Sequence, residues 1–340
     1  MRQLLRISNL QVRFPSFEGE ASVIDKLNLA IDRGEKVALV GESGCGKSLT
    51  ARIILGLINR RRAYISGQIR FDGTDLLTLS SAEWRTIRGR RISMIFQNPS
   101  AALNPVFTVG EQLATAVRRG GSANNLIEAK ALAREMLDRM SVVDPDRVLS
   151  SYPFQLSGGL NQRVLISMAL INRPDLILAD EPGTALDVTI QEQVLREMSN
   201  LAEMTGTAVL LISHNLGVVR AFTDRIYVMY AGQIVESAKT EALFRNPMHP
   251  YTAALFRAVP RLSADVPPRG IEGTIPDYVN APSGCRFRPR CSHAVPDCGL
   301  SLASTVLEED HRVRCVLYSG KERPYEPADD SEAPEPSNHV

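Results

Sequence analysis

The segment from Gly41 to Ser48 constrains this chain more than any other stretch. It reads Gly-Glu-Ser-Gly-Cys-Gly-Lys-Ser and fits the phosphate-loop pattern G-x-x-x-x-G-K-S without a gap. Its glycines let successive backbone N–H groups turn toward one anion, and a helix after them adds its positive end. Residues 36–40 predict a buried strand before the loop, and residues 47–57 predict a helix after it. The predicted phosphate-binding residues are Gly41, Glu42, Ser43, Gly44, Cys45, Gly46, Lys47 and Ser48.

The composition of the 340 residues is that of an ordinary globular protein, with 44% hydrophobic and 23% charged residues. A net charge of +1 gives no global field that would attract nucleic acid. No apolar run approaches the roughly 20 residues of a membrane helix, and the first residues lack the apolar core of a secretory signal. We therefore expect a cytoplasmic chain that meets a membrane only through a partner.

Four near-continuous apolar runs predict strands that are covered on both faces, as in a parallel α/β sheet. Ligands bind at the carboxyl ends of such strands, so the polar residues that follow them should meet at one site. The first of these strands precedes the phosphate loop. The others are residues 92–96, before Gln97; residues 176–179, before Asp180 and Glu181; and residues 208–213, before His214.

The remaining pattern divides the chain into parts. Residues 3–14 and 68–71 predict strands of a small antiparallel sheet beside the loop. Helical spacing over residues 109–118 and 126–140 predicts a helical subdomain at about 98–170. Prolines then break the chain after residue 240. The predicted parts are an α/β cassette over 1–240, a C-terminal appendage over 241–325 and a disordered tail over 326–340.

The polar strand ends supply what ATP hydrolysis requires: bound phosphates, a metal, a base for water and charge stabilisation at the γ-phosphate. Each residue is weak evidence alone, because a strand-ending Asp-Glu is usually a turn and a lone His is usually structural. The assignments are Lys47 to phosphate; Ser48, Asp180 and Gln97 to Mg²⁺; Glu181 and Gln97 to the attacking water; and His214 to the γ-phosphate.

A second anion-binding pattern follows in the helical part. Ser157, Gly158 and Gly159 open an apolar helix, although a simple helix N-cap explains the same residues. One ATP does not need two such cradles from one chain. The sequence therefore predicts that this second cradle closes on the nucleotide of another cassette.

With these motifs the chain resembles the ATP-binding cassette (ABC) family over residues 3–240. The resemblance implies two cassettes that dimerise head to tail around ATP, with Asp187 in the D-loop. It also makes Phe14 a candidate for stacking on adenine, although Phe14 equally suits the core of the first strand. Two residues depart from the pattern: Leu160 stands where many cassettes have Gln, and Gly183 where close relatives usually have Thr.

Further segments resemble the ATPases of dipeptide and oligopeptide importers. They are residues 95–99, 103–105, 185–189 and 246–252. The resemblance implies ATP-driven uptake of short peptides, or of nickel or another solute, at the cytoplasmic face of the membrane. Its implied partners are a second, often different, ATPase subunit, two transmembrane permease subunits and, indirectly, a solute-binding protein. A soluble ABC ATPase that acts on nucleic acid or ribosomes and a cysteine-based regulatory sensor are the alternatives.

Four cysteines gather near the C-terminus with the spacing C-x5-C-x6-C-x16-C. They are Cys285, Cys291, Cys298 and Cys315. Four thiolates can hold a [4Fe–4S] cluster or Zn²⁺, and the resemblance favours the cluster. Arg286, Arg288 and Arg290 lie between the first two cysteines. They are predicted either to offset the negative charge of a cluster or to form a solvated basic face.

Overall fold

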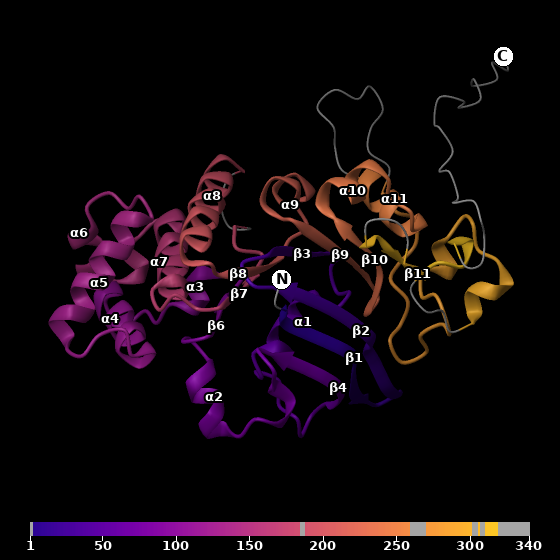
Figure 1. Ribbon diagram of the computed structural model, residues 1–340, viewed down its shortest axis with the longest axis horizontal. Coiled ribbons are helices and arrows are strands. Elements are labelled where there is room, and N and C mark those ends of the chain that lie inside the picture. The colour runs from indigo at the N-terminus through magenta and orange to yellow at the C-terminus, as the bar shows by residue number, and fades with distance from the viewer. Residues whose placement is uncertain (1–2, 184–187, 259–269, 301–304, 307–309, 319–340) are drawn as a thin grey trace, which may run out of the picture.

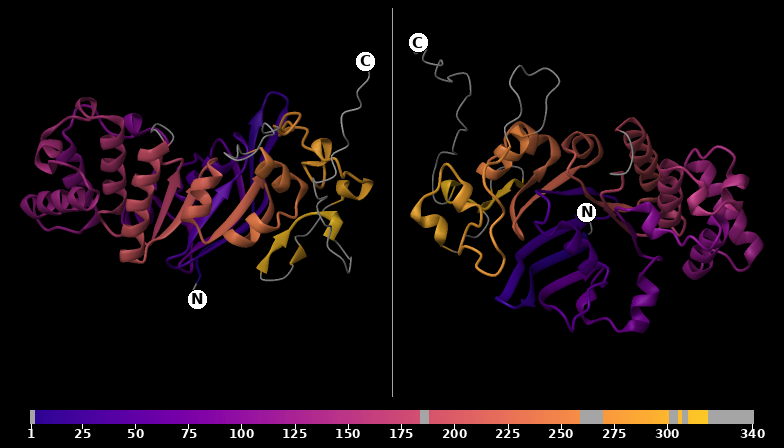
Figure 2. Two further views of the ribbon diagram at one scale, coloured as in Figure 1. Left: turned by 90° about the horizontal axis from the view of Figure 1, so that it is seen from above. Right: turned by 180° about the vertical axis from the view of Figure 1, so that it is seen from behind.

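The computed structural model describes residues 3–183, 188–258, 270–300, 305–306 and 310–318. An eight-stranded sheet and a four-stranded sheet form its centre, as Figures 1 and 2 show. A group of helices lies at one end of the molecule, and the C-terminal region lies at the other. The predicted α/β cassette, with a parallel sheet, an antiparallel sheet and a helical part, is confirmed.

The eight-stranded sheet has the order β11-β12-β10-β9-β3-β8-β7-β6, and its five strands from β9 to β6 are parallel. Val37 and Leu39 of β3 face one hydrophobic core, whereas Ala38 and Val40 face the other. Burial on both faces explains the unbroken apolar runs in the sequence. The strands are β3 (Lys36–Val40), β6 (Ile92–Ile95), β7 (Leu176–Asp180), β8 (Ala208–Ile212), β9 (Arg225–Tyr230), β10 (Gln233–Lys239), β11 (Thr305–Val306) and β12 (Arg312–Val313).

The four-stranded antiparallel sheet has the order β2-β1-β4-β5. Its strands are β1 (Gln3–Ser16), β2 (Gly19–Asp32), β4 (Tyr64–Phe71) and β5 (Thr74–Asp75). The predicted strands at 3–14 and 68–71 are confirmed within longer ones. The sequence reading missed β2, whose alternation is interrupted near Lys26 by a positive φ of 50° and by register shifts against β1.

The helical part begins after β6 and ends before β7. Helices α4 and α5 both coincide with predicted helices. Thr108 and Glu111 form a capping box at the start of α4, and the side chain of Asn125 caps α5. Their inward faces carry Leu113 and Leu137, which are fully buried. The elements of this part are α3 (Pro99–Ala102), α4 (Val109–Gly120), α5 (Leu126–Arg139), α6 (Pro145–Ser150), the 3₁₀ helix η2 (Pro153–Gln155) and α7 (Gly158–Leu170).

The remaining helices of the first 240 residues pack around the two sheets (Figure 1). They are α1 (Lys47–Ile54), η1 (Leu76–Thr78), α2 (Ser81–Ile87), α8 (Val188–Thr205) and α9 (Leu216–Phe222). Across the described ranges, no helix combines the length and the apolar character needed to cross a bilayer.

The C-terminal region is joined to the sheet and to the core. Strand β12 pairs with β10, so this region extends the eight-stranded sheet. Tyr251 and Phe287 are buried in the same hydrophobic core as Ala38 and Val40 of β3. The boundary predicted after residue 240 stays a prediction, and the tail predicted over 326–340 lies outside the described residues. The helices of the region are α10 (Thr240–Arg245), α11 (Pro250–Arg257), η3 (Arg288–Arg290), η4 (Pro296–Gly299) and η6 (Val316–Tyr318).

Candidate nucleotide-binding site

The phosphate loop, residues 41–48, adopts a backbone that requires glycine. The φ angles of Gly41, Gly44 and Gly46 are +152°, +81° and +109°. A Cβ atom on Gly41 would lie 2.1 Å from the carbonyl oxygen of Met229 in β9. The loop therefore turns sharply between β3 and α1 because its first glycine carries no side chain.

Lys47 and Ser48 begin helix α1 and lie against the loop. The Lys47 Nζ atom donates hydrogen bonds to the carbonyl oxygens of Gly41, at 2.7 Å, and Glu42, at 2.9 Å. The Ser48 hydroxyl donates to Asp180 Oδ1 at 2.8 Å. This last bond joins the phosphate loop to the end of β7, as the parallel-sheet prediction requires.

Asp180 is the last residue of β7 and is 2% exposed. Burial raises the pKa of its carboxyl above the usual value, and the hydrogen bond from Ser48 opposes that shift. A buried carboxylate beside a hydroxyl and an ammonium group is an oxygen ligand that suits Mg²⁺. The position fits the magnesium role predicted for Asp180.

Glu181 turns away from the strand into contact with two other predicted residues. Its φ is +48°, a left-handed conformation that is uncommon outside glycine, and its N–H donates to Ile212 O at 2.9 Å. Gln97 Nε2 donates to Glu181 Oε2 at 2.7 Å. His214 Nδ1 lies 3.2 Å from Glu181 Oε1. The ends of β6, β7 and β8 therefore meet at one carboxylate.

The sequence reading missed Gln162 of α7, whose side chain supports the same turn. It is 2% exposed and donates from Nε2 to Pro182 O at 2.5 Å. Gly183 follows, and a Cβ atom there would lie 2.4 Å from Gln191 Cγ in α8. The Gly183 N–H donates to Glu181 O at 2.8 Å. The sequence signal for Gln162 is weak, because it lies in a short polar run with Asn161 and Arg163 at the start of a mostly apolar helix.

The second predicted cradle is not brought to the phosphate loop of the same chain. The Ser157 hydroxyl accepts from Leu160 N at 3.4 Å and caps α7. Among the described residues, no hydrogen bond or ion pair joins Ser157, Gly158 or Gly159 to residues 41–48. Phe14 is partly buried against the core of the antiparallel sheet, and Asp187 lies outside the described residues.

Comparisons with known proteins match this arrangement. Residues 24–184 match the family described as ABC transporter, and residues 235–298 match the C-terminal region of oligopeptide/dipeptide transporters. The dipeptide transport ATP-binding protein DppD of Bacillus subtilis (strain 168) is 43% identical over 325 residues, which cover 93% of this chain and 95% of that protein. The chain belongs to the dipeptide and oligopeptide branch of the ABC transporter ATP-binding proteins.

Two further comparisons agree with this family. The oligopeptide transport ATP-binding protein AppD of the same Bacillus subtilis strain is 42% identical, with 94% of this chain and 98% of that protein covered. A dimeric structure of the ATP-binding cassette MJ0796 bound to ADP and Pi is 30% identical with a TM-score of 0.63. The match covers 70% of this chain and 99% of the MJ0796 chain. The predicted family, cassette fold and ATPase class are confirmed.

The four C-terminal cysteines of this ABC protein line one small pocket. His249, His293 and Arg288 line it as well. Cys285 Sγ lies 3.9 Å from His249 Nε2, and burial raises the pKa of Cys285, Cys291 and Cys315. The side chains form no group, within the described ranges, that is arranged to hold a metal ion. Thiols are ligands that soft metals and iron–sulfur clusters accept, but the described side chains do not bring these four together as one coordinating group.

The three arginines near these cysteines do not share one environment, as the prediction had assumed. Arg286 donates to Ala231 O at 2.6 Å and Ser22 O at 2.9 Å. Arg290 pairs with Glu42 of the phosphate loop. Arg288 alone of the three lines the cysteine pocket. The interpretation as a solvated face is therefore wrong for Arg286 and Arg290, whose side chains are buried and bond to the cassette, whereas their interpretation as counter-charges to a cluster stays a prediction.

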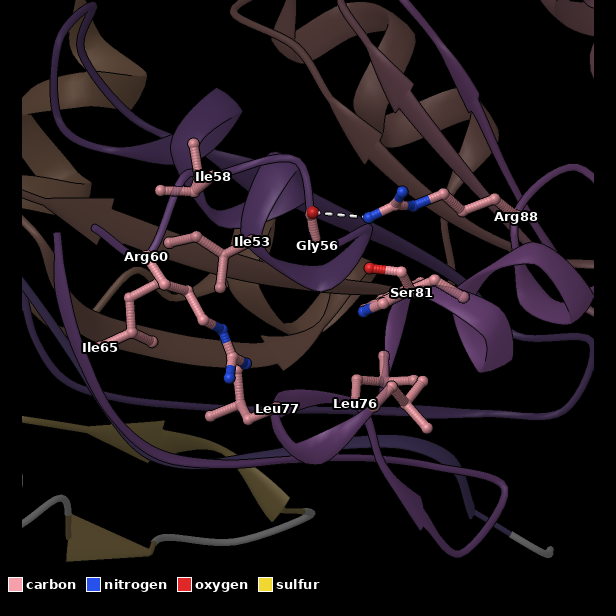
Figure 3. A pocket seen from close by; sticks show the side chains of 11 residues that line it. Ile53, Gly56, Ile58, Arg60, Ile65, Leu76, Leu77, Ser81 and Arg88 are labelled. Atoms are coloured by element: carbon pink, nitrogen blue, oxygen red, sulfur yellow. Dashed lines mark hydrogen bonds between the residues drawn. The ribbon is translucent and has the colours of Figure 1, made fainter. Parts of the chain in front are cut away.

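Another cavity, of about 240 Å³, lies between α1, β4 and α2 (Figure 3). Ile53, Ile65 and Leu76 contribute apolar walls, and Arg88 donates to Gly56 O at 2.6 Å across its rim. None of the predicted site residues lines it. It lies beyond the C-terminal end of α1, whereas the phosphate loop adjoins the opposite end, so the ABC nucleotide site and this cavity are separate.

Proposed function

We propose that this chain hydrolyses ATP to power import of short peptides across the cytoplasmic membrane. One observation carries the proposal. The Ser48–Asp180 pair and the Gln97–Glu181–His214 group lie at adjacent strand ends beside the phosphate loop. This set of groups serves phosphoryl transfer to water. Import of nickel or another small solute is the alternative, because other subunits choose the solute.

Each group has a chemical task in this proposal. Residues 41–48 would hold the phosphates of ATP through backbone N–H groups and Lys47. Ser48, Asp180 and Gln97 would hold Mg²⁺, which neutralises charge on the phosphates when bound. Glu181 is placed to accept a proton from water, and its hydrogen bonds from Gln97 and His214 fix its direction. His214, with a side chain 64% exposed, is free to reach the γ-phosphate.

The proposed unit contains more than one chain. Ser157 caps α7 and residues 158–159 begin it, without a hydrogen bond to their own phosphate loop among the described residues. This supports closure on the ATP of a second cassette, a paralogue or a copy of this chain. Phe14 and Asp187 keep their proposed roles at the adenine and in the D-loop. The segment after Gln97 would receive the coupling helix of a membrane subunit. The complete unit would have two transmembrane permease subunits, served by a solute-binding protein. These partners would place the chain on the cytoplasmic face of the membrane.

The four cysteines are proposed to hold a [4Fe–4S] cluster, with Zn²⁺ as the alternative. The support is a shared pocket lined by all four thiols. An absorbance spectrum of anaerobically purified protein, with iron, sulfide and zinc analysis, distinguishes the two. A cluster gives broad visible absorption with iron and sulfide, whereas zinc gives a colourless protein. Neither metal at stoichiometric content would refute the proposal.

Glu181→Gln tests the transport function in the complete importer. We expect the variant to bind ATP but to lose hydrolysis and uptake by at least about a hundredfold, since general-base groups contribute about 10²–10⁴. Glu192→Gln on α8 is the matched control, because Glu192 is 61% exposed and forms an ion pair with Arg196 of the same helix. Uptake that survives Glu181→Gln would refute the proposal. Hydrolysis without any uptake would favour a soluble ABC ATPase.

A further inference from the structure

Three side chains of the C-terminal region hydrogen bond to the phosphate loop. Arg290 forms a bidentate ion pair with Glu42, with its Nη1 and Nη2 atoms 2.7 and 3.0 Å from the two carboxylate oxygens. The Tyr278 hydroxyl donates to Gly44 O at 2.7 Å. The Glu42 N–H donates to the Tyr251 hydroxyl at 2.9 Å. Residues more than 200 positions away in sequence thus fix the second and fourth residues of the loop.

Arg290 is held by more than this ion pair. Its Nε atom donates to Glu272 O at 2.7 Å, and its Nη2 atom donates to Ile271 O at 3.0 Å. Its Nη1 atom also donates to the Tyr230 hydroxyl at 3.2 Å, and its side chain is only 5% exposed. Arg290 is buried and Glu42 is 26% exposed, so this bidentate pair with its donors satisfied differs from a fully exposed pair of negligible worth. Removing Arg290 leaves the partly buried Glu42 carboxylate unpaired in the phosphate loop.

The charge of Glu42 gives this pair its importance. A carboxylate on the second residue of a phosphate-binding loop repels the anion that the loop must hold. The Arg290 guanidinium draws this carboxylate to itself and neutralises it. The same contact fixes the direction of Glu42, whose carbonyl oxygen also accepts from Lys47 Nζ at 2.9 Å.

The segment that carries Arg290 also carries two of the pocket cysteines. Cys291 follows Arg290 directly, and Cys285 precedes Arg286. The two thiols line the cysteine pocket, whereas the two guanidinium groups bond to Glu42 and to Ala231 O. One short segment therefore contacts both the cysteine pocket and the cassette.

We propose that Arg290 is a positioning residue for nucleotide binding. It neutralises Glu42, holds the phosphate loop in its binding shape and couples that shape to the segment 285–291. This inference rests on the proposed function only in taking ATP as the nucleotide. It assigns to the C-terminal region a direct part in ATP affinity, besides any role of a metal at its cysteines.

Equilibrium binding of a fluorescent ATP analogue to the full chain tests the inference. We expect Arg290→Gln to raise Kd at least about tenfold, which corresponds to about 1.4 kcal/mol. Arg290→Lys should lose less, because it keeps the charge and gives up the bidentate geometry. The matched control is Arg312→Gln, since Arg312 lies in the same C-terminal region, its side chain is 55% exposed and it pairs with Asp310.

A double variant distinguishes positioning from simple damage. Adding Glu42→Gln to Arg290→Gln removes the uncompensated carboxylate, so we expect at least half of the lost affinity, on a logarithmic scale, to return. A purely structural loss would instead stay or deepen. Coupling is reciprocal, so ATP should slow amide hydrogen exchange over residues 285–291 in the wild type and do so less in Arg290→Gln.

The outcomes separate this inference from the proposed function. Wild-type protein that fails to bind ATP would refute the proposed function itself. Wild-type binding with an unchanged Kd in Arg290→Gln would overturn only the inference, as would equal losses in Arg290→Gln and Arg312→Gln or a double variant with no recovery. If Arg290→Gln does not fold, Arg290→Lys decides the question, and a Kd equal to that of the wild type overturns the inference.

Discussion

Two glycines of the phosphate loop should differ sharply in their tolerance of alanine. At Gly44, with φ +81°, an added Cβ atom meets no atom within 4 Å, so only the backbone conformation costs free energy, about 1 kcal/mol. At Gly41 the Cβ atom would lie 2.1 Å from Met229 O, so β3 and β9 must separate by about 1 Å to reach ordinary contact. Overpacking of this kind costs about 1–3 kcal/mol more, for a total of about 3 kcal/mol.

Thermal unfolding without nucleotide measures this difference. About 2–4 °C are lost per kcal/mol in chains of 150–250 residues, and somewhat less in longer ones. We therefore expect Gly44→Ala to lower Tm by about 2 °C and Gly41→Ala by about 6 °C or more. Gly44→Ala serves as the control, because it makes the same chemical change in the same loop. Equal losses would refute the argument that close contact with β9 selects glycine at position 41.

The remaining predictions concern the turn after β7. Because burial raises the pKa of Asp180, its ionised carboxylate destabilises the fold at neutral pH. Asp180→Asn should therefore raise Tm at neutral pH when EDTA removes metal ions. This gain should shrink as pH falls through the raised pKa and vanish below the unfolded value near 3.8; a gain that is constant with pH would contradict the cause. In a Gln191→Ala background, which lacks the side chain 2.4 Å from the added Cβ atom, Gly183→Thr should lower the free energy of unfolding by less than about 1 kcal/mol. A larger loss relative to Gln191→Ala alone would show that the backbone forbids threonine.

Much of the candidate nucleotide site was predictable because most of its residues follow a recognisable local pattern. Gln97, Asp180 and His214 each end an apolar run, and parallel strands bring such ends to one edge. The glycine spacing of residues 41–48 likewise reflects a local requirement of the backbone. Gln162 was missed because nothing in its own helix shows that its amide reaches Pro182.

The role of the arginines near the cysteines could not be predicted from their spacing. Arg286, Arg288 and Arg290 alternate along the chain, and the pattern does not say what faces each of them. The fold turns Arg290 toward Glu42 and leaves Arg288 at the cysteine pocket. Only the packing of the C-terminal region on β9 and the phosphate loop decides between these environments.

By itself the sequence determined the α/β cassette, the phosphate loop and the polar residues that end its strands. These features depend on contacts within one strand, one turn or one helix, so short patterns encode them. The tertiary structure decided which distant groups hold the loop, because Tyr251, Tyr278 and Arg290 reach it across more than 200 residues. Contacts of that separation depend on how whole elements pack, and no local pattern records them.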